Sequence, residues 1–473
     1  MTIEEDVLGA RRGTITAPAG CGKTQLIAEA LRHHQGKRPA LVLTHTNAGV
    51  SALRTRLHRL TVPADRYHVS TIDGFAKRLA GMFPRRSEIN LNALLLNDKK
   101  ADYPAIRQAA ITLIQAHHLD DVIAATYGRL LVDEYQDCIL PQHAIIDGLA
   151  EVLPTCVFGD PMQAIFGFAG PIVDWQKDVL ARFPLIVELD TPWRWINAGT
   201  RELGTWLLDA RRILEAGGSI DLQTAPAQVQ TVVLTAADAD AKRLLAARTR
   251  AVTAKGSVLI IGDSIKAARR HQVASQTPGA TCVEAVDLKD LTDFGARFDP
   301  ANPNAFEVLW DLGCSVMNNL GGKATLQRVD TLRRGRARTA ASPMEAGLVA
   351  FLASPSFQSA HVALIQMREH DNVRVYRPDV LHRCFSALQT AATGSHTLHE
   401  ATIQERERFR HRGRPLFSRN VGSTLLLKGL EAEVAVILHP ELMDARHLYV
   451  ALTRASHRVV VCSATTVLTP IKG

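Results

Sequence analysis

The residues best placed for chemistry in this sequence form a short loop near the N-terminus, Ala-Pro-Ala-Gly-Cys-Gly-Lys-Thr, between a β-type segment and a segment with helical periodicity. A strand that ends in such a loop and opens a helix directs several backbone N–H groups and the helix dipole at one point, where phosphate oxygens bind. Lys23 can reach the β- and γ-phosphates, and the Thr24 hydroxyl can hold Mg²⁺. The usual GxxxxGK[ST] pattern begins with glycine, and the loop departs from it only at this first position. The predicted nucleotide-binding residues of this segment are Ala17, Pro18, Ala19, Gly20, Cys21, Gly22, Lys23, Thr24 and Gln25.

A pair of carboxylates, Asp133 and Glu134, directly follows the apolar segment 130–132. In a nucleotide hydrolase the first carboxylate binds Mg²⁺ and the second polarises the attacking water as a general base. Most adjacent acidic pairs are solvated turns, but a buried strand before the pair and a phosphate loop upstream favour the functional interpretation. We therefore expect Asp133 to be a metal ligand and Glu134 to be the base.

A third candidate is the polar segment that follows the predicted strand 156–158. Its Gln163 could contact the γ-phosphate or the attacking water. Phe166 and Phe168 offer flat faces on which nucleic-acid bases stack. The alternative for both phenylalanines is a place in the hydrophobic core, which is the commoner role of this residue type.

Two more polar turns in the first half follow predicted strands, at residues 40–43 and 67–70, and each opens a segment with apolar residues at helical spacing. The carboxyl ends of parallel strands face the crevice in which α/β proteins bind ligands. We therefore expect the side chains of these turns to lie at the same edge of the sheet as the phosphate loop. They are His45, Thr46, Asn47, Thr71 and Asp73.

The order of these segments predicts an α/β fold. Strand, polar turn and helix repeat through the first half, with a helical insertion at about 85–121. In the second half, residues 257–261 and 434–438 are buried strands of the parallel type. Between them, from about 283 to 376, strand signals fade and helix-compatible segments alternate with turns.

The composition is that of an ordinary globular protein: 473 residues, 46% hydrophobic and 22% charged, with a formal net charge of +8. The positive balance suits a polyanionic partner such as nucleic acid. The seven scattered cysteines form no CxxC pair, which argues against a disulfide framework, a zinc ribbon or an iron–sulfur site. The N-terminus lacks the pattern of a signal peptide, and no apolar run approaches the length of a membrane span. We therefore expect a cytoplasmic protein with no membrane partner.

Taken in order, these segments resemble the motifs of the UvrD/Rep/PcrA-type superfamily 1A DNA helicases. Ala at the first position of the phosphate loop is a variant found in that family. The matching segments are 17–24 (motif I), 44–47 (motif Ia), 71–74 (the TxxG element), 133–137 (the DExxQD box), 159–168 (motif III), 189–194 (motif IV), 423–431 (motif V) and 449–455 (motif VI).

The resemblance implies two RecA-like P-loop NTPase domains, residues 1–190 and 191–473, each with a reduced helical insertion and with ATP and Mg²⁺ between them. It implies that Arg194 approaches the γ-phosphate, that Glu431 binds the nucleotide sugar and that Arg454 is an arginine finger. The implied catalytic residues are Lys23, Glu134, Gln163, Arg194 and Arg454. The implied metal ligands are Thr24 and Asp133, and the implied DNA contacts are His45, Thr46, Asn47, Thr71, Asp73, Phe166, Phe168 and Ser423.

The activity that the resemblance implies is ATP-dependent translocation in the 3′ to 5′ direction on single-stranded or tailed duplex DNA. Several residues depart from the family pattern. No glutamine precedes the phosphate loop to read adenine, and His45, Ala169 and Leu425 stand where the family usually has Phe, Arg and His. Base selectivity is therefore left open.

The short insertions are similar to those of the helicase-like subunit of the Gabija antiphage system, which works with a nuclease. An alternative function is therefore a DNA-sensing regulatory ATPase that controls a partner nuclease and unwinds little DNA by itself. The sequence leaves both functions open, and with them a role in DNA repair or in antiviral defence.

Overall fold

The computed structural model describes residues 2–96, 99–167, 170–411 and 417–472. The chain forms two compact units. The first comprises Met1–Val229, Met443–His457 and Thr466–Gly473, and the second comprises Gln230–Leu442 and Arg458–Thr465. The domain boundary predicted at residue 190 stays a prediction.

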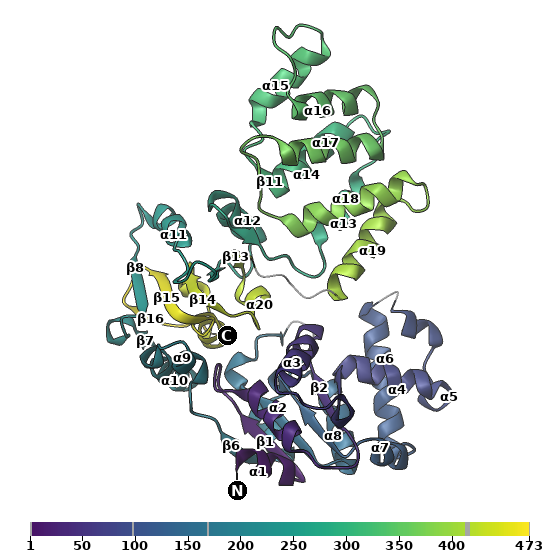
Figure 1. Cartoon of the computed structure of the whole chain (residues 1–473), viewed down its shortest axis with the longest axis vertical. Helices are drawn as coiled ribbons and strands as arrows, with labels where there is room; N and C mark the ends of the chain where they lie inside the picture. The colour runs from purple at the N-terminus through teal and green to yellow at the C-terminus, as the bar shows by residue number, and fades with distance from the viewer. Residues whose placement is uncertain (1, 97–98, 168–169, 412–416, 473) are drawn as a thin grey trace. The chain divides into compact units, whose positions relative to one another are not determined.

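The first unit is built on a six-stranded sheet in the order β3-β2-β4-β5-β1-β6. Figure 1 labels its strands β1, β2 and β6. All neighbouring strands in it are parallel. Every residue of β2 and β4 is buried, which matches the apolar character of these segments in the sequence. The strands are β1 (Arg12–Thr16), β2 (Ala40–Thr44), β3 (Tyr67–Thr71), β4 (Arg129–Val132), β5 (Thr155–Gly159) and β6 (Leu185–Glu188).

Helices cover both faces of this sheet, because successive side chains of a strand point to opposite sides. Leu41 and Leu43 of β2 pack with α4, α6 and α8, whereas Val42 packs with α2 and α3. The helices of this unit are α1 (Ile3–Gly9), α2 (Lys23–His33), α3 (Asn47–Arg59), α4 (Ile72–Met82), α5 (Pro84–Ser87), α6 (Lys99–Gln115), α7 (Asp120–Thr126), α8 (Leu140–Val152), α9 (Trp193–Asn197), α10 (Arg201–Glu215) and α21 (Ala445–Leu452). Helices α5 to α7 occupy the segment predicted as a helical insertion.

The second unit contains another six-stranded sheet, in the order β10-β13-β9-β14-β15-β8. The pairs β10–β13, β13–β9 and β9–β14 are parallel. Two such sheets flanked by helices confirm the predicted α/β fold. The strands are β8 (Val229–Val233), β9 (Val258–Ile261), β10 (Thr281–Cys282), β13 (Arg419–Gly422), β14 (Ala432–Ile437) and β15 (Ala455–Ser463).

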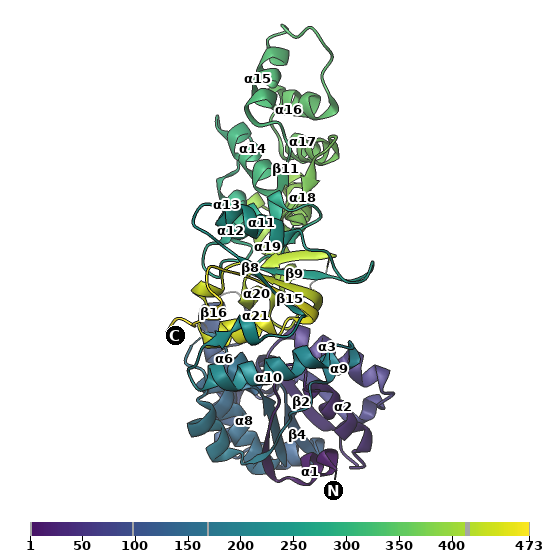
Figure 2. The same cartoon turned by 90° about the vertical axis from the view of Figure 1, so that its left-hand side faces the viewer.

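A separate helical cluster belongs to the second unit and has its own hydrophobic core, which includes Leu309, Phe351 and Leu388. Figures 1 and 2 show α15, α16, α17 and α18 stacked in succession. The helices continue past residue 376, where the sequence predicted an end, because α18 and α19 contribute apolar residues to the same core. The cluster comprises α13 (Lys289–Arg297), α14 (Ala305–Val316), α15 (Gly322–Arg333), α16 (Pro343–Ala353), α17 (Phe357–Glu369), α18 (Pro378–Ala392) and α19 (Leu398–His411).

The remaining helices of the second unit are α11 (Ala239–Ala247), α12 (Ala267–Gln276) and α20 (Thr424–Leu427). All seven cysteines are free thiols, and only Cys314 is exposed. Among the described residues, no helix combines the length and the apolar character that crossing a bilayer requires.

Candidate nucleotide-binding site

The loop after β1 has the backbone that a phosphate-binding loop needs. Gly20 has φ 74° and Gly22 has φ 88°, both in the left-handed region that favours glycine. A Cβ atom at Gly20 would lie only 2.5 Å from the Trp195 ring, so a larger residue would also clash. Gly22 is the N-cap of α2, and the helix begins at Lys23. The first N–H groups of α2 have no partner within the helix, as an anion site requires.

The ammonium of Lys23 lies between the two predicted carboxylates. Its Nζ is 3.2 Å from Asp133 Oδ1 and 2.5 Å from Glu134 Oε1. The Lys23 and Asp133 side chains are 10% and 5% exposed, whereas that of Glu134 is 33% exposed. The structure therefore joins three predicted site residues from two elements that are more than a hundred positions apart in the chain.

Charge and burial act in opposite directions on the pKa values of Lys23 and Asp133. Burial would lower the pKa of Lys23, but the carboxylates of Asp133 and Glu134 outweigh it and raise that pKa, so the side chain stays cationic at neutral pH. Burial raises the pKa of Asp133, although Lys23 acts against it. A dication beside Asp133 would favour the ionised carboxylate.

The backbone of Glu134 is left-handed, with φ 56° and ψ 39°. Such a conformation in a residue other than glycine costs about 1–3 kcal/mol and is typical of functional sites. Gln136 Nε2 donates to Glu134 Oε2 at 2.6 Å, and the Glu134 N–H donates to Asp133 Oδ1 at 2.9 Å. The carboxylate of Glu134 is thus held from both sides, by Lys23 and by Gln136.

Gln163 is connected to this group through Asp160, which is fully buried. Gln163 Nε2 donates to Asp160 Oδ2 at 3.0 Å, and the Asp160 N–H donates to Gln136 Oε1 at 3.1 Å. Neither Gln136 nor Asp160 is among the predicted site residues, although both stand in the DExxQD and GDxxQ segments of the sequence.

The two predicted arginines lie in the first unit together with the phosphate loop. Arg194 donates from Nη1 to the Thr453 carbonyl at 2.6 Å, and its backbone N–H donates to the Gly20 carbonyl at 3.1 Å. Arg454 is 3% exposed, and its Nε donates to the Val450 carbonyl at 2.8 Å. The role of Arg454 as an arginine finger stays a prediction.

Helix α21, which ends just before Arg454, is itself attached to the phosphate loop. The hydroxyl of Tyr449 accepts a hydrogen bond from the Ala19 N–H at 3.0 Å, and Tyr449 is buried. The segment that carries Arg454 is therefore bonded directly to the start of the loop that carries Lys23.

Trp193 is a candidate site residue that the predicted set of nucleotide-binding residues does not include. Its surface is 51% exposed, and its Cδ1 would be 3.2 Å from a Cβ atom placed at Gly22. An exposed indole beside a phosphate loop offers a flat face to a nucleotide base. The signal was present in the sequence, because Trp193 directly precedes Arg194.

Three hydroxyls predicted to contact DNA are helix N-caps. Thr46 accepts from the Gly49 N–H at 3.0 Å, Thr71 accepts from the Gly74 N–H at 3.0 Å, and Ser423 accepts from the Leu426 N–H at 3.3 Å. These bonds satisfy N–H groups at the starts of α3, α4 and α20.

Asp73, also predicted to contact DNA, forms a bidentate ion pair in which both carboxylate oxygens are 2.7 Å from Arg107. Gln142 donates a further hydrogen bond to it at 3.2 Å. These contacts join α4 to α6 and α8 and give Asp73 a structural function.

His45 and Phe166 lie together, with ring centroids 5.8 Å apart and ring planes inclined by 43°. Asn47, near His45, is exposed. Phe168 and Ala169 lie outside the described residues. Ser423 and Glu431 belong to the second unit, and the predicted role of Glu431 stays a prediction.

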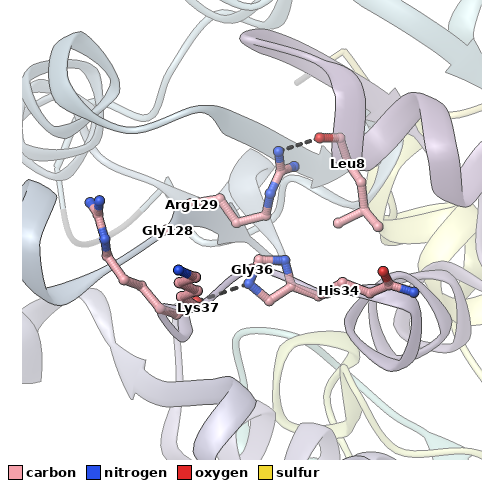
Figure 3. A pocket seen from close by; sticks show the side chains of 8 residues that line it. Leu8, His34, Gly36, Lys37, Gly128 and Arg129 are labelled. Atoms are coloured by element: carbon pink, nitrogen blue, oxygen red, sulfur yellow. Dashed lines mark hydrogen bonds between the residues drawn. The ribbon is translucent and has the colours of Figure 1, made fainter.

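A basic cavity of about 550 Å³ lies at the opposite edge of the first sheet, before β2 and β4 (Figure 3). Arg129 donates there to the carbonyls of Val7 and Leu8 in the last turn of α1, and Arg38 donates to the carbonyl of Ala124 in α7. These guanidinium groups satisfy carbonyls at helix ends, so we assign no ligand to the cavity.

The ligating atoms of His271, Cys282 and Glu284 lie within 4.8 Å of one another in the second unit. Both oxygens of Glu284, however, accept hydrogen bonds from Arg377, at 2.7 and 2.8 Å. Arg377 also pairs with Asp290 at 2.7 Å. The carboxylate is therefore neutralised by a buried guanidinium, and we assign no metal to this cluster.

In a comparison with protein-family models, residues 90–175 match the UvrD/REP helicase N-terminal domain. The matched segment contains Asp133, Glu134 and Gln163 but not the phosphate loop, whose identification depends on its own residues and geometry. No curated protein matches the chain. The match supports a place for the chain in the UvrD/Rep-type helicase superfamily and a helicase-type, ATP-hydrolysing function.

Proposed function

We propose that this protein is an ATP-dependent DNA translocase or helicase that moves 3′ to 5′ on single-stranded DNA. The observation that carries the proposal is the contact of Lys23 with Asp133 and Glu134 beside a glycine loop at a helix N-terminus. A phosphate-binding cation, a metal-binding carboxylate and a base within one hydrogen-bonded group are what phosphoryl transfer to water requires.

Each residue of the group has a distinct task. The N–H groups at the start of α2 and the ammonium of Lys23 bind the phosphates of ATP. Glu134 accepts the proton of the attacking water, and Gln163 orients that water or the γ-phosphate. Arg194 and Arg454 stabilise the negative charge that develops in the transition state.

Thr24 and Asp133 fit Mg²⁺, because a hydroxyl and a buried carboxylate are oxygen ligands of the kind that this ion prefers. Bound there, Mg²⁺ supplies charge neutralisation at the phosphates. The exposed indole of Trp193, beside the phosphate loop, stacks on the base.

For DNA, the tilted pair of His45 and Phe166 offers a surface on which a base stacks. The 3′ to 5′ direction rests on the resemblance to superfamily 1A helicases.

A second candidate function is a regulatory ATPase that responds to DNA and controls a partner nuclease. The observation that favours it is that Thr46, Thr71 and Asp73 make structural contacts within the protein. A helicase that depends on few DNA contacts would couple hydrolysis to movement weakly.

Two measurements distinguish the helicase from the regulatory ATPase. The first is ATP turnover with and without single-stranded DNA, and the second is strand displacement on 3′-tailed and 5′-tailed duplexes. Stimulated turnover with displacement of the 3′-tailed duplex alone is the result expected for the helicase. Stimulation without displacement would favour the regulatory ATPase. The matched control is Glu134→Gln, and a wild-type protein that turns over no ATP would contradict both functions.

A further inference from the structure

Arg211 on α10 is a buried cation that is not among the predicted nucleotide-binding or catalytic residues. It is 4% exposed and contacts three carboxylates. Its Nε donates to Asp160 Oδ1 at 3.1 Å, and its Nη1 lies 3.2 Å from Glu188 and 3.0 Å from Glu215.

The three partners differ in their dependence on Arg211. The Glu188 and Glu215 side chains are 50% and 46% exposed, so water can replace the guanidinium at both. Asp160 is fully buried, and an ionised carboxylate in such a place requires a compensating charge. The contact with Asp160 is therefore the one that loss of Arg211 would disturb most.

Asp160 in turn connects the two side chains assigned to the attacking water. Its Oδ2 accepts from Gln163, while its backbone N–H donates to Gln136, which donates to Glu134. Its Oδ1, the atom bonded to Arg211, also accepts from the Met162 N–H at 3.1 Å. With Oδ1 fixed in this way, Oδ2 is directed at the amide of Gln163.

We infer that Arg211 is a positioning residue for ATP hydrolysis: through the carboxylate of Asp160 it fixes the orientation of Gln163. This inference rests on the proposed ATPase function. It gives α10 a role in catalysis in addition to the roles of the phosphate loop and of the acidic pair.

The test is steady-state ATP hydrolysis by the full chain carrying Arg211→Met, Arg211→Lys or the control Arg212→Met. Arg212 is the next residue of α10, with a side chain 68% exposed and paired with Asp209. We expect Arg211→Met to lower kcat about 10-fold or more, with KM and the Kd for ATP changed less than about 2-fold. Arg211→Lys should recover part of kcat, and Arg212→Met should match the wild type.

Because a buried Asp160 without its partner would also destabilise the fold, the double variant Asp160→Asn/Arg211→Met is measured beside the single one. We expect the double variant to regain Tm, since the unpaired charge is gone, and to keep a low kcat, since the amide at position 160 is not held in one orientation. A return of Tm and kcat together would assign Arg211 a purely structural role and overturn the inference.

Unchanged kcat in Arg211→Met, or a loss confined to KM, would also overturn it. In either case wild-type turnover would leave the proposed function standing. Absence of turnover in the wild type would overturn both.

Discussion

In the segments that follow the strands of the first sheet, Lys23 meets Asp133 and Glu134, whereas in the second sheet β9 is followed by Gly262 and the buried Asp263. Asp263 accepts hydrogen bonds from the N–H groups of Ile265 and Lys266, at 2.9 and 2.8 Å, and pairs with Arg269 at 3.1 Å, so its partners come from its own turn and from the helix that follows it. In the first sheet the opposite charges come from different elements and meet. Similar sheets thus differ in whether an edge carboxylate finds its partners within the next few residues of the chain or in a cation more than a hundred residues away.

Among substitutions that distinguish the two sheets, Lys23→Ala is expected to have the largest effect. Without the ammonium, the phosphates lose their principal cation and the two carboxylates face each other without compensation. We expect turnover to fall by about 10²-fold or more and nucleotide binding to weaken, measured by ATPase assay and by titration with a fluorescent nucleotide. The control is Lys266→Ala, which removes an exposed lysine at the edge of the second sheet and should leave both quantities unchanged.

Glu134→Gln tests the base separately from the cation. The amide keeps the size of the side chain but accepts no proton, so turnover should fall by about 10²–10⁴-fold while the Kd for ATP changes little. Single-turnover kinetics and equilibrium binding measure the two effects. On the second sheet, Glu433→Gln alters a carboxylate bonded to Thr253 and should leave kcat at the wild-type value. Normal turnover in Glu134→Gln would remove Glu134 as the base.

Trp193→Ala tests whether the nucleotide base is recognised beside the phosphate loop of the first sheet. Loss of one stacking face should weaken ATP binding by about 10-fold, with little effect on kcat at saturating ATP. Trp193→Phe should keep most of the affinity. Competition between ATP and GTP, measured for the wild type and for Trp193→Ala, would show whether the indole also sets base preference. Equal ATP affinities in the wild type, Trp193→Ala and Trp193→Phe would exclude a contact of the indole with the base.

The smallest effect is expected from Asp263→Asn. Burial would raise the pKa of Asp263, but the backbone N–H groups and Arg269 outweigh it and lower that pKa. The ionised carboxylate therefore stabilises the fold above the unfolded-state pKa of about 3.9, and this contribution is lost as the pH falls through the lower folded-state pKa. Asp263→Asn should cost about 1 kcal/mol or less at pH 7 and progressively less as the pH falls below the unfolded-state pKa, measured by denaturant unfolding, with ATPase activity unchanged. A loss of activity would place nucleotide chemistry at this edge too.

The proximity of Lys23 to the acidic pair could be predicted from the sequence, because parallel strands bring their carboxyl ends to one edge wherever they lie in the chain. The contacts of Trp193 and Arg211 could not, because they depend on how α9 and α10 pack against the first sheet. The family resemblance implies a DNA contact for Asp73, whereas its observed partner Arg107 comes from the helical insertion. Local pattern gives the place of a polar side chain but not its partner.

The hydrogen bond between Ala19 and Tyr449 joins residues 430 positions apart in the chain. Closing so long a connection is slow, and during synthesis it cannot form until Tyr449 has left the ribosome. The helix that supports the phosphate loop is therefore synthesised about 430 residues after the loop itself. During that interval a nascent chain carries the loop without this support.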